Sequence, residues 1–358
     1  MREEHGVSLS GLTTMRVGGP AQRLVTVQTT DELVDAIREV DDADEPLLVV
    51  AGGSNLVVSD EGFAGSVVRI ATSGISLESA DSSAVMVRVA AGEVWDEVVI
   101  QAVAQGWSGI EALSGIPGCA GATPIQNVGA YGQEVAQSIA SVRVWDRREQ
   151  QVQTFANADC RFTYRNSLFK AEPRYVVLDV VLHLRMSTLS GPVDYAGLAH
   201  TLGVEAGARV PLAQAREAVL AQRRQKGMVL DAADHDTWSC GSFFTNPIMS
   251  AGSYAGLQDR ARARLGSSDG AARLPRFNGP DGQVKTSAAW LIDKAGFSKG
   301  YRMPGPAALS TKHCLAVTNR GSATAADVVV LAREIRDGVH DAFGVSLVNE
   351  PALVGISL

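Results

Sequence analysis

The apolar positions of this chain recur with two periods, one typical of helices and one typical of strands. Leu33, Ile37 and Val40 lie three or four positions apart, which predicts an amphipathic helix. Thr30 and Asp31 are its candidate N-cap residues, because their side chains accept hydrogen bonds from a first helical turn. Apolar runs predict strands at residues 23–28, 47–50, 67–70, 85–90, 142–145, 152–155, 175–184 and 313–318.

Four further helical patterns are each followed by a glycine, which ends a helix readily because the left-handed conformation costs it little. Together with the first helix, at residues 30–40, these patterns predict helices at residues 94–105, 211–226, 286–295 and 324–342. The first helix lies between two strands and forms a small α/β unit, whereas the later region has many strands and few helices, which is typical of α+β proteins. The strand at 175–184 is apolar on both faces, so we expect it at the centre of a sheet, and we expect the run 345–358 to be extended.

Two glycine-rich loops interrupt this pattern. Residues 114–132, SGIPGCAGATPIQNVGAYG, contain five glycines and two prolines and are too rich in small residues for a helix. The backbone N–H groups of such a loop bind anions, and a tight crossover between strands explains the composition equally well. The second loop, residues 51–56, follows the strand at 47–50, and open α/β sheets bind ligands at the carboxyl ends of their strands. Its presence favours the anion-binding interpretation of both loops.

The composition of the chain is that of an ordinary globular protein. Its 358 residues exceed one typical domain, so we expect two or three. Hydrophobic residues make up 46% and charged residues 20%, which argues against disorder. The net charge of −7 argues against a dedicated nucleic-acid surface and against a polybasic membrane patch, so we expect neither nucleic-acid binding nor membrane insertion.

The cysteines and the start of the chain bear on the cellular compartment. Cys119, Cys160, Cys240 and Cys314 form no C-x-x-C pair, so neither a zinc site nor a redox dithiol is predicted. The opening MREEHGVSLS has no apolar segment of a secretory signal, and no apolar run approaches the roughly 20 residues of a membrane helix. We therefore expect a soluble, cytoplasmic protein.

Two common nucleotide-binding motifs are absent from the sequence, and their absence limits which ligand-binding folds are predicted. No G-x-G-x-x-G opens a helix and no G-x-x-x-x-G-K-[ST] occurs, so neither a Rossmann fold nor a P-loop is predicted. The two glycine loops can still bind a dinucleotide diphosphate through their backbone amides. None of the six histidines lies in either loop, which argues against a flavin attached through histidine and against a histidine-based metal site.

Four later segments carry side chains suited to catalysis or binding. Arg165 lies in CRFTYRNSLFK, Ser242 in CGSFFTNP, Lys226 at a helix end, and Glu350 in the apolar C-terminal run. Each also has a structural explanation. An ion pair would explain Arg165, and a turn would explain Ser242. The helix dipole favours the charge of Lys226, and a salt bridge would explain Glu350. For any one of them alone, the structural explanation is preferred.

Taken together, these segments resemble the UDP-N-acetylenolpyruvoylglucosamine reductase (MurB) family over nearly the whole chain and in the same order. The loop at 114–132 and the run GSFFTNP are highly specific to it, whereas TTMRVGG alone is weak. The matching segments are TTMRVGG (13–19), AGGSNLVV (51–58), the loop 114–132, CRFTYRNSLFK (160–170), CGSFFTNP (240–247), AAWLIDKAG (288–296) and the terminal Glu350.

The resemblance implies an α+β fold with a two-lobed FAD-binding domain of the vanillyl-alcohol-oxidase type and a C-terminal α+β substrate-binding domain. By this resemblance the first lobe spans residues 1–72, rejoined by 346–358, the second lobe 73–212, and the substrate domain 213–345. It also implies tightly but non-covalently bound FAD and NADPH as the hydride donor. The implied reaction converts UDP-N-acetylglucosamine enolpyruvate to UDP-N-acetylmuramate during peptidoglycan precursor synthesis.

The resemblance also implies the roles of individual residues and no metal. Arg165 and Glu350 match the residues that stabilise the enolate of the substrate, and Ser242 matches the proton donor to carbon, whereas Cys240 matches none of them. The residues implied to bind FAD are Arg16 as a supporting cation, Gly52, Gly53, Ser54, Asn55, Leu56, Ile116, Pro117, Gly118, Thr123, Gln126, Asn127 and Gly129. The residues implied to bind the nucleotide-sugar substrate are Tyr195, in the tyrosine loop of the longer subtype, Lys226 and Asn246.

The chain departs from the family pattern around Glu350. Asn349 precedes the glutamate where the family commonly has proline, and Ala352 follows where some members have arginine. The assignment of Glu350 is retained because Phe343 and Gly355 keep their spacing from it. The nucleotide contact of that arginine is not expected here.

Two alternatives remain open at the level of sequence. A flavin oxidase or dehydrogenase of the same cofactor fold would share the glycine loops, but GSFFTNP and Glu350 favour the reductase. A nucleotide-binding module without activity would be expected to lack Arg165, Ser242 or Glu350, and all three are present. We expect a monomer whose partners are the small-molecule substrates alone.

Overall fold

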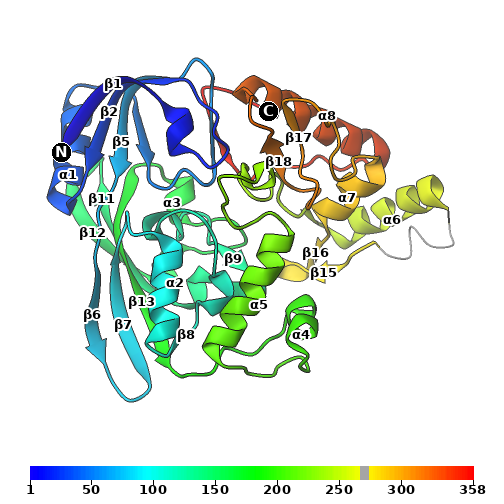
Figure 1. The fold of residues 1–358 in the computed structure, drawn as a ribbon, viewed down its shortest axis with the longest axis horizontal. Helices are drawn as coiled ribbons and strands as arrows, with labels where there is room; N and C mark the ends of the chain where they lie inside the picture. Colours follow the sequence, from blue (N-terminus) through cyan, green and yellow to red (C-terminus); the bar gives the residue numbers. More distant parts are fainter. Residues whose placement is uncertain (267–273) are drawn as a thin grey trace. The chain divides into compact units, whose positions relative to one another are not determined.

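The computed structural model describes residues 1–266 and 274–358, and its ribbon is drawn in Figure 1. The described chain divides into two units, each of which is assembled from separate segments. Unit 1 consists of Met1–Ser8, Pro20–Gly53 and Gly62–Leu230, and unit 2 of Leu9–Gly19, Ser54–Glu61 and Asp231–Leu358. The loop predicted at residues 51–56 therefore begins in unit 1 and ends in unit 2.

The first sheet of unit 1 has the strand order β1-β2-β5-β3. Its elements are β1 (Arg2–Ser8), β2 (Pro20–Val27), α1 (Thr30–Asp42), β3 (Leu47–Val50) and β5 (Phe63–Ile70). Strands β2, β5 and β3 are parallel, so the predicted strand–helix–strand unit is confirmed. The N-cap of α1 is Thr29 rather than Thr30 or Asp31, because the Thr29 side chain accepts the hydrogen bond from Glu32 N.

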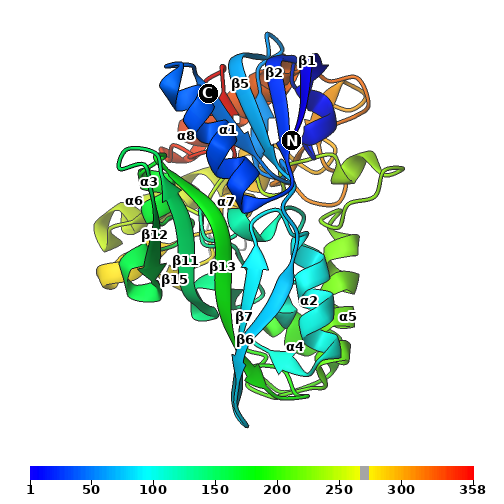
Figure 2. The ribbon, with the colours of Figure 1, turned by 90° about the vertical axis from the view of Figure 1, so that its left-hand side faces the viewer.

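The second sheet of unit 1 is antiparallel and has the order β12-β11-β13-β7-β6, with β8 paired to β13. Its strands are β6 (Ile75–Ala80), β7 (Ala84–Ala90), β8 (Trp107–Ser108), β11 (Ile139–Asp146), β12 (Gln151–Ala156) and β13 (Tyr175–Met186). The central position predicted for the strand at 175–184 is confirmed, and Figure 2 shows β6 and β7 at one edge of the sheet. The sequence analysis missed β6, because its side chains are almost all exposed and leave no apolar pattern.

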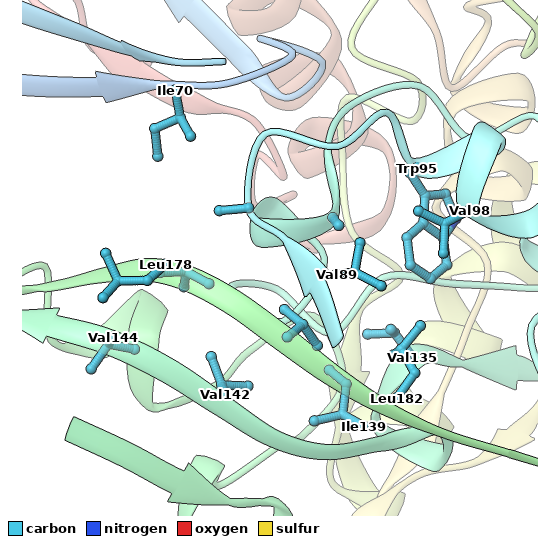
Figure 3. Close-up of a cluster of buried hydrophobic side chains, with 14 of the residues drawn as sticks. Ile70, Val89, Trp95, Val98, Val135, Ile139, Val142, Val144, Leu178 and Leu182 are labelled. Atoms are coloured by element: carbon cyan, nitrogen blue, oxygen red, sulfur yellow. The ribbon is translucent and has the colours of Figure 1, made fainter. Parts of the chain in front are cut away.

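The core of unit 1 lies where this sheet packs against α2 (Trp95–Ala104), in good agreement with the helix predicted at 94–105. Figure 3 shows part of the buried cluster, with Val89 of β7 beside Trp95 and Val98 of α2. The indole Nε1 of Trp95 donates to the carbonyl of Leu113 at 3.1 Å. Because Leu113 directly precedes the loop 114–132, the core fixes the start of that loop.

A small satellite core completes unit 1. It joins α4 (Ala196–Leu202) to α5 (Leu212–Gln225), and its buried side chains include Leu198, Val210 and Val219. Helix α5 confirms the pattern predicted at 211–226, but α4 was missed by the sequence analysis. The remaining elements of unit 1 are the hairpin of β9 (Gly129–Ala130) and β10 (Gln133–Glu134), and the short helix α3 (Leu168–Ala171).

Unit 2 is built around the long helix α8 (Ala325–Phe343). The stripe predicted for this helix is confirmed, since Val328, Leu331, Ile335 and Val339 are all buried. Its other elements are β4 (Leu56–Val58), β14 (Ile248–Met249), α6 (Ala251–Leu265), β15 (Phe277–Asn278), β16 (Val284–Lys285), α7 (Ala288–Ala295), β17 (Ala307–Leu309), β18 (Val317–Asn319) and β19 (Ala352–Val354). The strands pair as β14-β16-β15, β17-β18 and β19-β4.

Three expectations for unit 2 need correction. The strand predicted at 313–318 is wrong for most of its length, because the hydroxyl of Ser310 accepts hydrogen bonds from the backbone of Lys312 and His313 in a turn. Helix α7 begins at Ala288, after the N-cap Ser287, and not at position 286. The C-terminal run 345–358 forms a strand only over β19.

The functional domains predicted from the resemblance have other boundaries than these two units. Their division at residues 72, 212 and 345 stays a prediction, and residues 267–273 of the predicted substrate domain lie outside the described residues. Among the helices of the described chain, none combines the length and the apolar character that crossing a membrane requires.

Candidate active site

The two predicted glycine loops meet through their backbones in unit 1. A Cβ atom added to Gly52 would lie 2.6 Å from the Cα atom of Gly118, closer than real Cβ contacts allow. Gly53 and Gly118 have φ angles of +55° and +114°, in the region that glycine tolerates best. Glycine is therefore required at position 52 because another backbone occupies the space of a side chain.

A partly buried ion pair braces the start of the loop 114–132. Asp96 of α2 accepts a hydrogen bond from the backbone N–H of Gly115 at 2.6 Å and a bidentate pair from Arg216 of α5 at 2.7 and 2.8 Å. Burial disfavours the charge of Asp96, but the hydrogen bonds from Arg216 and Gly115 outweigh it and hold the pKa of this carboxyl below its usual range. The carboxylate thus connects two helices to the loop.

Asn127 and Thr123 hold the loop together with their side chains. The amide of Asn127, which is buried at a φ of +47°, donates to Glu134 Oε2 at 2.8 Å and to the carbonyl of Thr163 at 3.1 Å. The hydroxyl of Thr123 donates to the carbonyl of Ala120 at 2.7 Å. Their backbone N–H groups also donate within the loop, to the carbonyls of Ala120 and Pro124 at 3.1 and 3.4 Å. The other predicted loop residues, Ile116, Pro117, Gly118, Gln126 and Gly129, are partly buried.

Arg165 is anchored on the same loop. Its Nη1 donates to the carbonyl of Asn127 at 3.2 Å and its Nη2 to the carbonyl of Gly129 at 2.8 Å, while its guanidinium carbon lies 5.3 Å from the ring centre of Tyr164. Its φ of +54° is uncommon for a residue with a side chain and often marks functional sites. The structure thus brings the predicted catalytic arginine and the predicted cofactor loop together in unit 1.

Tyr195 and Lys226 meet around a third residue, Tyr131. The rings of Tyr131 and Tyr195 pack edge to face with centres 5.3 Å apart, and Lys226 Nζ lies 5.7 Å from the ring centre of Tyr131. Tyr131 was missed by the sequence analysis, although it lies within GAYG. Its φ of +49° is a strained value for an aromatic residue, and only a structure shows it.

Ser242 and Glu350 are brought close by paired backbone segments in unit 2. Ser242 directly precedes Phe243, whose carbonyl accepts the backbone N–H of Glu350 at 2.8 Å. The neighbouring residues Phe244 and Asn349 form an antiparallel bridge. The segment CGSFFTNP and the C-terminal run therefore lie side by side, although they come from distant parts of the chain.

The second half of the loop 51–56 reaches the same place in unit 2. Asn55 Nδ2 donates to the carbonyl of Glu350 at 3.1 Å, and the backbone N–H of Ala352 donates to the carbonyl of Asn55 at 3.0 Å. Leu56 then starts β4, which pairs in parallel with β19 from Ala352 onward. Ser54 and Leu56 are partly buried beside Asn55.

Cys240 lies beside this arrangement but differs chemically from Ser242. Its Sγ is 3.5 Å from the carbonyl of Leu56, and burial raises the pKa of the thiol to about 12. A thiol with so high a pKa stays protonated and unreactive at neutral pH.

Arg16 and Asn246 are the remaining predicted residues of unit 2. Arg16 is exposed at a φ of +55°, and its guanidinium carbon lies 3.9 Å from the ring centre of Trp238. Asn319 Nδ2 holds this segment by donating to the Arg16 carbonyl at 3.2 Å. Asn246 Oδ1 accepts the backbone N–H of Ala288 at 3.0 Å, so its amide is oriented by the first turn of α7.

The predicted residues thus fall into two groups, each described within its own unit. Unit 1 holds Arg165, Tyr195 and Lys226 around the loop 114–132, and unit 2 holds Ser242, Glu350 and Asn246. In the described part of the chain, no group of three or more histidine, cysteine, aspartate or glutamate side chains is arranged to bind a metal ion.

Two family models match this chain. Residues 21–155 match the family described as FAD binding domain, and residues 232–354 match the UDP-N-acetylenolpyruvoylglucosamine reductase C-terminal domain. Together with the solved structure below, they confirm the fold class expected from the sequence, an α+β protein with an FAD-binding domain and a separate C-terminal domain.

Relatives match over the whole chain. A UDP-N-acetylenolpyruvoylglucosamine reductase of Streptomyces avermitilis is 56% identical over 360 residues, covering 100% of this chain and 96% of the relative. The corresponding protein of Thermobifida fusca is 54% identical over 352 residues, with 98% of each chain covered. The crystal structure of UDP-N-acetylenolpyruvylglucosamine reductase from Thermus caldophilus is similar with a TM-score of 0.66 and 27% identity, covering 99% of each chain.

The contact between Gly52 and Gly118 predicts that a single methyl group impairs cofactor binding. We expect Gly52→Ala to lower the ratio of bound flavin to protein by about tenfold or more, because the added methyl group meets backbone atoms of Gly118 and Cys119, which cannot yield without displacing the loop. The flavin absorbance of the purified protein measures this ratio. Gly252→Ala is the matched control, since a Cβ there meets only Ser250 Oγ at 3.9 Å; equal flavin content in both variants would contradict the prediction.

The ion pair of Asp96 predicts a pH-dependent stability. Its pKa is lower in the folded protein than in the unfolded chain, so its contribution is complete at neutral pH and is lost as the pH falls through the folded pKa. We expect Asp96→Asn to reduce the free energy of unfolding by about 1–3 kcal/mol at neutral pH and by progressively less in acid. Urea unfolding between neutral and acid pH measures the difference, with the exposed Asp35→Asn as control. A difference that does not change with pH would count against the ion pair.

Proposed function

The chain belongs to the UDP-N-acetylenolpyruvoylglucosamine reductase family, and we propose that Arg165, Ser242 and Glu350 are its catalytic residues. It is a flavin-dependent oxidoreductase that reduces UDP-N-acetylglucosamine enolpyruvate to UDP-N-acetylmuramate, with FAD as cofactor and NADPH as hydride donor. The product is a precursor of peptidoglycan.

The loops of unit 1 fit a bound dinucleotide. The backbones of Gly52 and Gly118 are in contact, and Gly53 and Gly118 both turn with positive φ angles. Turns of this kind present backbone N–H groups to a diphosphate. When bound, FAD carries the hydride from NADPH to the enolpyruvyl group of the substrate, while the protein supplies orientation and electrostatics.

We propose that the following residues bind FAD, chiefly through their backbone. The residues are Gly52, Gly53, Ser54, Asn55, Leu56, Ile116, Pro117, Gly118, Thr123, Gln126, Asn127 and Gly129, with Arg16 as a supporting cation. The internal hydrogen bonds of Asn127 and Thr123 support this assignment, because they rigidify the loop before any ligand binds.

Arg165 suits the negative charge that develops during the reaction. Hydride addition to the vinyl carbon leaves charge on the adjacent carbon, and it spreads into the attached carboxylate of the substrate. Two hydrogen bonds to the carbonyls of Asn127 and Gly129 fix the plane of the Arg165 guanidinium. A preorganised cation of this kind stabilises developing charge in a dry site, which is usually the largest catalytic contribution.

Glu350 and Ser242 complete the proposed chemistry. Glu350, in its protonated form, would donate a hydrogen bond to the same substrate carboxylate, and the hydroxyl of Ser242 would donate a proton to the charged carbon. Their placement on two adjacent backbone segments supports this division of roles, because the bond between Phe243 and Glu350 fixes the spacing of the two chains.

Tyr195, Lys226 and Asn246 are proposed to bind the nucleotide-sugar diphosphate. An ammonium and a phenol suit phosphate oxygens, and Lys226 and Tyr195 both lie against Tyr131. The Asn246 amide is oriented by its bond to α7. These assignments follow the positions of the family motifs in this chain.

The proposed domain roles follow the same resemblance. Residues 1–72 with 346–358, and residues 73–212, would bind FAD, and residues 213–345 would bind substrate. The pairing of β19 with β4 supports the return of the C-terminus to the first lobe. We propose that the protein acts as a monomer in the cytoplasm, where NADPH and nucleotide sugars are made, and that it needs no nucleic-acid partner.

The experiment that tests the proposed function is an anaerobic titration. The flavin is first reduced with NADPH, and UDP-N-acetylglucosamine enolpyruvate is then added while the flavin absorbance is followed. Return of the oxidised spectrum without oxygen is the expected result. A flavin that stays reduced until air is admitted would indicate an oxidase instead.

Ser242→Ala separates proton donation from cofactor binding. We expect this variant to bind flavin and to be reduced by NADPH normally, whereas reduction of the enolpyruvyl substrate slows by about 10²- to 10⁴-fold, the usual range for a missing general acid. Stopped-flow measurement of the two half-reactions distinguishes them, and the exposed Ser346→Ala is the matched control. Normal turnover of the Ser242 variant would exclude the proposed role.

A further inference from the structure

The helix that presents Tyr195 is too short to be stable alone. Helix α4 has seven residues, and Tyr195 is its N-cap without a side-chain capping bond. Isolated helices shorter than roughly 12 residues are marginal in water. The position of the Tyr195 ring, which is 43% exposed, therefore depends on what holds α4 in unit 1.

Gln222 of α5 makes the polar contact that holds this helix. Its side chain is 9% exposed, and its Nε2 donates to the carbonyl of Gly197 at 2.7 Å and to the hydroxyl of Thr201 at 2.8 Å. Gly197 and Thr201 lie four positions apart on α4, so one amide of α5 spans a full turn of the shorter helix. The Thr201 hydroxyl also donates to the Gly197 carbonyl at 3.1 Å, which closes the network.

The Tyr195 ring lies directly beside this network. A Cβ atom added to Gly197 would lie 3.0 Å from Tyr195 Cε1 and 3.9 Å from Gln222 Oε1. The ring thus covers the space above Gly197, next to the Gln222 amide. A shift of Gln222 would move Gly197, whose carbonyl it binds, and with it the start of α4 at Tyr195.

Lys226 is linked to the same side chain through α5. It is the C-cap of this helix and follows Gln222 by four residues, so the two side chains are neighbours on one face. Tyr131 contacts both the Tyr195 ring and the Lys226 ammonium. Tyr131 thus joins the two predicted substrate-binding side chains, and Gln222 lies one helical turn before Lys226.

A buried carboxylate secures the other end of the Tyr195 segment. Glu111, which is 2% exposed, accepts the backbone N–H of Gly191 at 2.6 Å and the side-chain amide of Gln133 at 3.0 Å. Gln133 directly follows the loop 114–132. The chain leading to Tyr195 is therefore attached at its start to the loop and at α4 to α5.

We propose that Gln222 is a positioning residue that fixes Tyr195 relative to Lys226, so that the phenol and the ammonium reach the same anionic group, the diphosphate of the nucleotide-sugar substrate. The inference rests on the substrate-binding roles proposed above for Tyr195 and Lys226. Gln222 itself contacts only protein atoms and acts through Tyr195.

The variant Gln222→Met tests this role, because it keeps the volume of the side chain and removes both donors. We expect the dissociation constant and the KM for UDP-N-acetylglucosamine enolpyruvate to rise by about tenfold, with a smaller change in kcat. Flavin content and Tm serve as checks of folding. The matched control is Gln214→Met, at an exposed position in the first turn of the same helix, which we expect to leave all of these quantities unchanged.

A double-mutant cycle distinguishes positioning from a general structural role. In a Tyr195→Ala background, Gln222→Met should change the dissociation constant by less than about twofold, since there is no longer a phenol to position. An effect as large as in the wild type would overturn the inference, and so would an unchanged KM in the single variant. Failure of the wild type to oxidise its flavin with the substrate would instead contradict the proposed function.

Gly197→Ala keeps the inference testable if Gln222→Met fails to fold. Alanine is favoured over glycine in helices, so α4 should not be weakened, but the new methyl group displaces the Tyr195 ring. We expect the KM to rise several-fold at an unchanged or higher Tm. An unchanged KM in a folded Gly197→Ala protein would overturn the proposal.

Discussion

The contact between the backbones of Gly52 and Gly118 is the constraint on which the arrangement of the two glycine-rich loops depends. No side chain larger than hydrogen fits at position 52, because the segment after β3 is in direct backbone contact with the loop 114–132 there. The surrounding packing serves this approach: Trp95 fixes Leu113 before the loop, and Asp96 fixes Gly115 within it. The hydrophobic core of unit 1 and the loop 114–132 are thus parts of one arrangement.

Residues whose identity reflects a local backbone requirement were predictable from the sequence. Glycines at 52, 53 and 118 are required by their own contacts and φ angles, and the stripe of α8 follows directly from helical periodicity. The motif around Arg165 was equally recognisable. Its anchoring on the loop carbonyls was not, because hydrogen bonds between segments 38 residues apart leave no local pattern.

Sequence reasoning missed α4, α6 and β6, two of which have little local pattern. Helix α4 has little pattern of its own and is positioned by Gln222 from another helix, while β6 is an edge strand with almost no buried side chain. The strand expected at 313–318 was displaced because the hydroxyl of Ser310 competes for the amides of the turn. The contacts that decide α4 therefore come from another part of the chain, whereas Ser310 acts within its own turn.

The composition of unit 2 from three distant segments has a consequence for biosynthesis. Strand β4 is synthesised long before its partner β19, and 295 residues separate Asn55 from the carbonyl of Glu350 that it binds. The nascent chain must therefore carry an unpaired β4 until β19 has emerged from the ribosome. Glu350 reaches its position by the same late step, so a chain interrupted before this segment has both glycine-rich loops but lacks the carboxyl group that we propose for catalysis.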